Sequence, residues 1–115
     1  MAARTKATVT VTRWKGSQHP TKATIVRMMK EQQLRPYMWS NMPNHRYAVR
    51  SHNYDKVLYV LNGVVEVTLP DSNQRVKLRT GDRIDIPASV RHGMQIGHTG
   101  AECVEAARRT ARRQR

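Results

Sequence analysis

The chain between residues 36 and 106 is a succession of short runs in which apolar and polar residues alternate, separated by turn-forming residues. Alternation with a period of two is typical of β-strands that bury one face. The runs predicted to form strands cover residues 36–41, 45–52, 57–61, 64–70, 74–79, a short stretch within 80–89, 91–97 and 101–106. Short strands separated by turns about every 8–12 residues indicate a β-sandwich or barrel. The predicted fold class is therefore all-β.

Two of the turns are marked by residue type. Asn62-Gly63, flanked by alternating apolar residues, is the strongest short-range pattern for a β-hairpin. It predicts that residues 57–61 and 64–70 form two paired strands joined by a tight turn. The stretch from Pro70 to Asn73 predicts a second turn, which leads into the strand at residues 74–79.

Residues 7–35 form an amino-terminal extension of this β-rich region. Alternation at residues 7–14 predicts a strand. Residues 21–34 fit one short helix, because Ile25, Met28 and Met29 follow i, i+3, i+4 spacing and Pro20 lies where a first turn tolerates proline. Pro36 ends the helix, since the residue before a proline avoids helical geometry. The methionine pair is predicted to pack against the sheet.

Length and composition limit the class of protein. At 115 residues the chain is predicted to be a single domain. Cys103 is the only cysteine, so no internal disulfide can form, and a buried, unreactive thiol in a reducing compartment is expected. No apolar run approaches the ~18 residues needed to cross a membrane, and the amino terminus lacks the apolar segment of a secretory signal. The expected location is the cytoplasm, without a membrane partner.

The net charge is +13, from 21 Lys and Arg residues against 8 Asp and Glu residues. Such an excess is expected of a protein that binds polyanions. However, residues 107–115 are predicted to be an arginine-rich, disordered tail, and the remaining cations are scattered without stacking aromatics or a helix-turn-helix pattern. Because phosphate affinity alone does not read a nucleotide sequence, a nucleic-acid-associated basic protein is the least favoured of the functions considered.

Two motifs within residues 36–106 resemble those of the cupin superfamily, whose members are small jelly-roll barrels built as double-stranded β-helices. The second family motif, G-x5-P-x-G-x2-H-x3-N, fits at Gly81, Pro87 and His92. The first motif, G-x5-H-x-H-x3–4-E-x6-G, fits at His52 and Gly63. The resemblance implies a small single-domain cupin of the RmlC-like jelly-roll type, with one short amino-terminal α-helix, a pocket for a small molecule or ion, and a homodimer.

The chain departs from the family at the metal-ligand positions. Arg50 stands at the first histidine of motif one and Lys56 at its glutamate, so the family's ligand side chains are kept only at His52 and His92. Three further positions depart from the motifs: Asn44, Ser89 and Ile96. Motif one is therefore degenerate.

Strand parity places the two cations beside the two histidines. Side chains alternate faces along a strand, so Arg50 shares a face with His52, and Lys56 shares one with Leu58. His92 and Met94 likewise share a face. If the histidines point into the barrel, the two cations are expected to point there as well. The predicted ligand pocket comprises Arg50, His52, Lys56, Leu58, His92 and Met94.

Several interpretations of this pocket stay open. A catalytic metal site typically takes three protein ligands, so a Zn, Fe, Mn or Ni ion in an oxygenase- or isomerase-type enzyme would need His52, His92 and a third ligand, such as Asp55 or His45. Nearby positive charge opposes such an ion. The histidines could instead be barrel residues without an ion, or the cations could bind a carboxylate or other small anion. The main hypothesis is a protein that binds a small molecule or ion in a degenerate metal site; no catalytic residue is assigned and no cofactor is certain.

Overall fold

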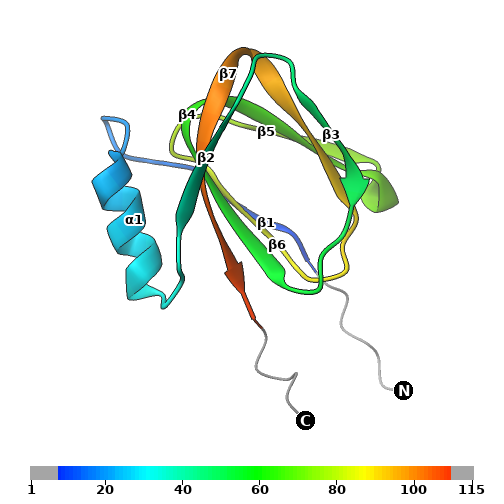
Figure 1. The fold of residues 1–115 in the computed structure, drawn as a ribbon, viewed down its shortest axis with the longest axis horizontal. Coiled ribbons are helices and arrows are strands. Elements are labelled where there is room, and N and C mark those ends of the chain that lie inside the picture. Colours follow the sequence, from blue (N-terminus) through cyan, green and yellow to red (C-terminus); the bar gives the residue numbers. More distant parts are fainter. Residues whose placement is uncertain (1–7, 110–115) are drawn as a thin grey trace.

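The computed structural model describes residues 8–109. Within this range the chain forms one α-helix and seven strands (Figure 1). The elements are β1 (Thr10–Thr12), α1 (Lys22–Glu31), β2 (Tyr37–Asn41), β3 (Arg46–Arg50), β4 (Asp55–Leu69), β5 (Gln74–Leu78), β6 (Arg83–Ile86) and β7 (His92–Arg108). The prediction of an all-β jelly roll with one short amino-terminal helix is confirmed.

The strands pair antiparallel in the order β1-β6-β4-β7-β2, with β3 added to β7 and β5 added to β4. They curve round into a barrel, and α1 lies outside its wall, next to β2 (Figure 1). The predicted turn at Pro70 is a short 3-10 helix, Pro70–Ser72, that connects β4 to β5. The two longest strands, β4 and β7, pair along most of their length and therefore form the frame to which the shorter strands are added.

The predicted hairpin at Asn62-Gly63 is wrong. The chain does not reverse there, because β4 continues through both residues, and Asn62 pairs with Glu102 while Gly63 pairs with Ala101. Gly63 has φ +94°, a conformation that L side chains rarely adopt, and a Cβ at this position would clash with the carbonyl oxygen of Gly100. The dipeptide thus marks a bend in β4 at which its backbone lies unusually close to that of β7. On the opposite strand, the predicted strands 91–97 and 101–106 are likewise one strand, β7.

This shared bend shifts the side-chain alternation of both long strands by one residue. On β4, Leu58 and Val60 face the barrel core before the bend, and Val65 and Val67 face it afterwards. On β7 the inward positions change in the same way between residues 96 and 101. The inner core comprises Leu58, Val60, Val65, Val67, Leu69, Leu78, Ile84, Ile86, Met94, Ile96, Ala101 and Cys103. One strand pair can therefore line the barrel on both sides of the bend.

The helix covers the outer face of the β4–β7 pair. Its amino-terminal cap is Thr21, whose side chain accepts a hydrogen bond from the Thr24 backbone N–H. Ile25 and Met29 are fully buried against outward-facing residues of β4 and β7, such as Val104, which confirms that the helix packs on the sheet. The helix ends at Glu31, three residues earlier than predicted, and β1 is shorter than the predicted strand at 7–14.

The last strand of the barrel extends further toward the carboxy terminus than predicted. β7 extends to Arg108, so the first two residues of the predicted arginine-rich tail belong to a strand. Residues 110–115, which carry the rest of that prediction, lie outside the described range. Within residues 8–109, no helix has the length and apolar composition required to cross a bilayer.

Candidate functional site

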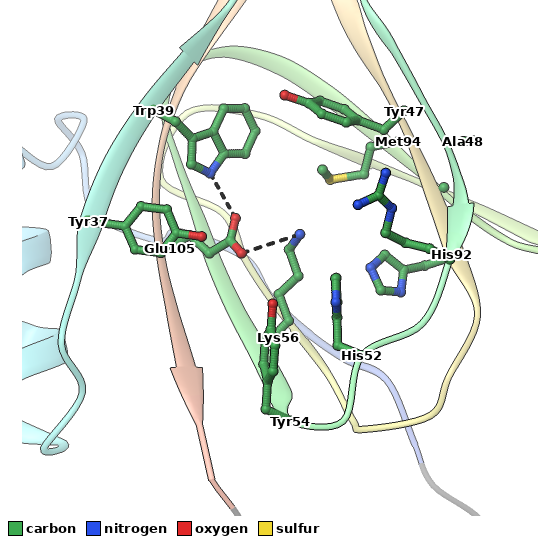
Figure 2. Close-up of a pocket in the computed structure, with 12 residues that line it drawn as sticks. Tyr37, Trp39, Tyr47, Ala48, His52, Tyr54, Lys56, His92, Met94 and Glu105 are labelled. Carbon is green, nitrogen blue, oxygen red and sulfur yellow. Dashed lines mark hydrogen bonds and ion pairs between the residues drawn. The ribbon is translucent and has the colours of Figure 1, made fainter.

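A cavity of about 400 Å³ opens at one end of the barrel. Its walls come from β2, β3, the loop before β4, the start of β4, and both ends of β7 (Figure 2). The lining residues are Tyr37, Trp39, Tyr47, Ala48, Arg50, His52, Tyr54, Lys56, His92, Gly93, Met94 and Glu105. β7 reaches the cavity twice, because the strand is long enough for His92 and Glu105 to lie on opposite walls.

Most of the predicted pocket residues lie together in this cavity. Arg50, His52, Lys56, His92 and Met94 all line it, and they form a gradient from solvent to interior. Arg50 is exposed and His52 is partly buried, whereas Lys56 and His92 are only 6% and 3% exposed. Arg50 therefore lies on the solvent side of the cavity, and Lys56 and His92 lie in its interior.

Three other predicted residues lie elsewhere. Leu58 is fully buried in the barrel core below the cavity and does not line it. Asp55 accepts a hydrogen bond from the Ala88 backbone N–H at 2.9 Å and lines a hollow on the outside of the barrel, because adjacent strand positions point to opposite faces. His45 is exposed and contacts the ring of Tyr47 edge-on, with centroids 4.6 Å apart.

Glu105 is the main functional residue that the sequence interpretation missed. Its carboxylate lies 3.4 Å from the Lys56 ammonium, and the two side chains are only 7% and 8% exposed, respectively. The indole N–H of Trp39 donates a hydrogen bond of 2.8 Å to the other carboxylate oxygen (Figure 2). Glu105 therefore compensates the charge of Lys56 and is itself held in place by Trp39.

Both cavity histidines are held in the neutral form at neutral pH. Burial is the main cause that lowers the pKa of His52 and of His92, and the positive charge of Lys56 lowers both further. The Nδ1 of His92 lies 3.0 Å from the Val90 carbonyl oxygen. In the neutral ring this nitrogen donates, which leaves Nε2 as an acceptor. The two rings lie close together, with centroids 5.3 Å apart.

Aromatic rings make up much of the remaining wall. The ring of Tyr54 stacks on His52 at a centroid distance of 4.8 Å, and Trp39 contacts Tyr47 edge-to-face at 6.1 Å. Tyr37 completes this wall, and burial together with the nearby Glu105 carboxylate raises its pKa, so the phenol stays protonated. These rings offer flat apolar surfaces on more than one side of the cavity.

The residues present do not fit a divalent metal ion. Among residues 8–109 there is no cluster of three or more His, Cys, Asp or Glu side chains that could hold one. The only carboxylate that lines the cavity, Glu105, is paired with Lys56, so His52 and His92 have no third ligand beside them. The Lys56 ammonium also places a repulsive positive charge near both imidazoles.

The fold of this chain is found in several solved structures. A comparison with family models gives no match, and neither does a comparison with curated proteins. A cupin-2 domain containing protein from Shewanella frigidimarina is 18% identical, with a TM-score of 0.56 over 66% of this chain and 71% of that one. A cupin superfamily protein from Desulfitobacterium hafniense is 14% identical, with a TM-score of 0.59 over 96% of this chain and 84% of that one. The polyketide cyclase RemF from Streptomyces resistomycificus is 24% identical, with a TM-score of 0.59 over 64% and 53% of the two chains.

These similarities identify the molecule as a small protein with the cupin fold. The resemblance drawn from the two sequence motifs is thereby confirmed at the level of the fold. Because the identities are low, the function has to be argued from the cavity itself.

Proposed function

We propose that this cupin-fold protein binds a small, planar organic acid in the barrel cavity, with the acid group against Arg50. The observation that carries the proposal is that the cavity holds two cations but one carboxylate. Glu105 is paired with Lys56, whereas Arg50 has no acidic partner within ion-pair distance in the range 8–109. With both histidines neutral, the cavity carries one uncompensated positive charge.

The position of Arg50 suits the capture of a carboxylate. A guanidinium group offers two parallel N–H donors that match the two oxygens of a carboxylate. Arg50 lies on the rim, where its charge is available to an incoming anion and where no desolvation of a buried arginine is required. Binding then exchanges solvent around the carboxylate for charge-assisted hydrogen bonds.

The cavity walls indicate the size and shape of the rest of the ligand. A volume of about 400 Å³ lies within the range of small-molecule pockets, and it is flanked by the rings of Trp39, Tyr47 and Tyr54. A flat ring contacts such surfaces over a large area and loses little conformational freedom on binding. The geometry therefore favours a planar acid over a flexible one.

Calorimetric titration with benzoate tests the proposal. Wild-type protein is expected to bind benzoate more tightly than benzamide, which lacks the charge, and more tightly than cyclohexanecarboxylate, which lacks the planar ring. Replacement Arg50→Gln is expected to weaken benzoate binding by about tenfold or more, since hydrogen bonds to charged groups contribute about 1.5–3 kcal/mol. Arg46→Gln is the matched control, because Arg46 lies on the same strand, contacts Gln95, and does not line the cavity.

Two results would overturn the proposal. One is equal affinity for benzoate in the wild-type protein and the Arg50→Gln variant. The other is one metal ion per chain in the purified protein, detected by elemental analysis and lost on His52→Ala or His92→Ala, which would favour the metal-dependent alternative.

A further inference from the structure

Lys56 occupies a central position on the floor of the cavity. In Figure 2 its ammonium group lies between the Glu105 carboxylate and the pair of imidazole rings. The side chain is 8% exposed, so its charge is shielded from bulk water. A buried lysine is costly unless an anion compensates it, and here Glu105 supplies that anion while Trp39 fixes Glu105 from the other side.

The ammonium group has donors to spare. It carries three N–H bonds, and the contact with Glu105 accounts for one carboxylate oxygen at 3.4 Å. Lys56 also lines the cavity, so its remaining donors are accessible to a molecule bound there. The group is therefore both fixed in position and able to bind an additional oxygen atom.

We infer that the Lys56 ammonium is the resident cation of this cavity and takes the place of a divalent metal ion in binding an oxygen atom of the ligand. Two features of the residues support this role: a carboxylate that holds the cation, and two neutral imidazoles beside it that find no third metal ligand. Unlike a metal ion, this cation is part of the chain and cannot be removed by a chelator.

The position of Lys56 also narrows the class of ligand, and this step rests on the proposed function. A planar acid bound through Arg50 at the rim presents its opposite edge to Lys56 on the floor. A hydroxyl or carbonyl oxygen on that edge would accept a hydrogen bond from the ammonium group. The structure therefore favours planar acids that carry a second oxygen substituent, of which the hydroxybenzoates are the simplest probes.

The first experiment examines metal binding and needs no ligand. Replacement Lys56→Glu removes the resident cation and places a second carboxylate beside Glu105 and the two imidazoles, a donor set suited to Zn²⁺, Mn²⁺ or Ni²⁺. After dialysis against each metal, we expect about one ion per chain in this variant and only substoichiometric metal in the wild-type protein. Addition of both His52→Ala and His92→Ala to Lys56→Glu leaves only two carboxylates and is expected to abolish the uptake, which separates a cavity site from surface binding.

A second variant keeps this experiment decisive. If Lys56→Glu is unfolded by circular dichroism with and without metal, Lys56→His adds a third imidazole without a second carboxylate and is used in its place. Stoichiometric metal in the wild-type protein, held by His52 and His92, would overturn the inference. So would a folded variant at position 56 that takes up no metal.

The second experiment examines the ligand. The double variant Lys56→Met/Glu105→Gln removes both charges at similar side-chain volume, so Arg50 still determines the affinity for benzoate. We expect the best-bound hydroxybenzoate isomer to lose about tenfold in affinity relative to benzoate in this variant. Equal losses for both probes would refute the role of Lys56 in binding the second oxygen, whereas loss of the dependence on Arg50 alone would refute only the proposed function.

Discussion

Replacement Glu105→Gln tests the energetic importance of the buried ion pair. The amide is nearly the same size as the carboxylate and keeps an oxygen that can accept the hydrogen bond from Trp39. What changes is the charge, since Lys56 is left without its anion in a position where its side chain is 8% exposed. The expected effect is therefore a loss of stability caused mainly by an uncompensated ammonium group.

The structure sets the expected magnitude. Removing one partner of a buried ion pair costs about 3–5 kcal/mol in the free energy of unfolding, whereas an exposed pair is worth about 0–1 kcal/mol. The side chains of Lys56 and Glu105 are both less than a tenth exposed, so the larger figure applies. Small domains are stable by only about 5–15 kcal/mol, and the loss should therefore be obvious.

Urea unfolding followed by far-ultraviolet circular dichroism measures the effect. With a slope of about 2 kcal/mol per molar urea, the midpoint of Glu105→Gln is expected to fall by about 1.5–2.5 M. The double variant Lys56→Met/Glu105→Gln has no unpaired charge and should recover to within about 1 kcal/mol of the wild-type protein, because removing both members of a buried pair is often neutral. The single variant Lys56→Met is expected to be destabilised like Glu105→Gln, since it leaves the carboxylate unpaired.

The four proteins form a double-mutant cycle, which can refute the predicted coupling between Lys56 and Glu105. If the two single losses add in the double variant, the side chains are not energetically coupled and the reasoning is wrong. A loss below about 1 kcal/mol in Glu105→Gln would also contradict it, because that is the behaviour of a solvated surface pair.

Two further predictions concern the bend and the histidines. Replacement Gly63→Ala combines a positive φ with a clash against the carbonyl of Gly100, so the free energy of unfolding should fall by at least about 2 kcal/mol. Gly97→Ala is the control, because Gly97 has no positive φ, and it should cost less. Equal losses in the two variants would contradict this account. The lowered pKa values of His52 and His92 predict that stability is complete above about pH 6.5 and falls as the pH drops below it, because the unfolded chain binds these protons first. Unfolding measured between about pH 7.5 and 5.5 should lose part of this dependence in His52→Gln/His92→Gln, and an unchanged slope would refute the assignment.

The fold was predictable because its determinants are local. Period-two alternation located most of the strands, and the spacing of Ile25, Met28 and Met29 located the helix. The hairpin prediction failed because Asn62-Gly63 has the composition of a tight turn, yet the pairing of β4 with β7 continues across it. No property of residues 57–70 alone reveals that a second strand bends at the matching position.

The same bend explains why Glu105 was not predicted to lie in the cavity. The alternation that groups His92 with Met94 is correct, but it shifts by one residue across the four residues from Gly97 to Gly100. After them the inward positions on β7 are those of Cys103 and Glu105. The alternation of Cys103 and Glu105 with Val104 and Ala106 is visible in the sequence, but which set faces the barrel depends on where the helix packs.

The pairing of β4 with β7 also has a consequence for the order in which the molecule assembles. Asp55 pairs with Arg108 at one end of the ladder and Thr68 pairs with Gly93 at the other, so every contact between these strands closes a long loop. Chains dominated by such pairings fold in about milliseconds to seconds. Lys56 is on one of these strands and Glu105 on the other, so the ammonium group gains its anion only when β4 and β7 pair. The charge inside the cavity is therefore balanced in the same step that joins the two long strands of the barrel.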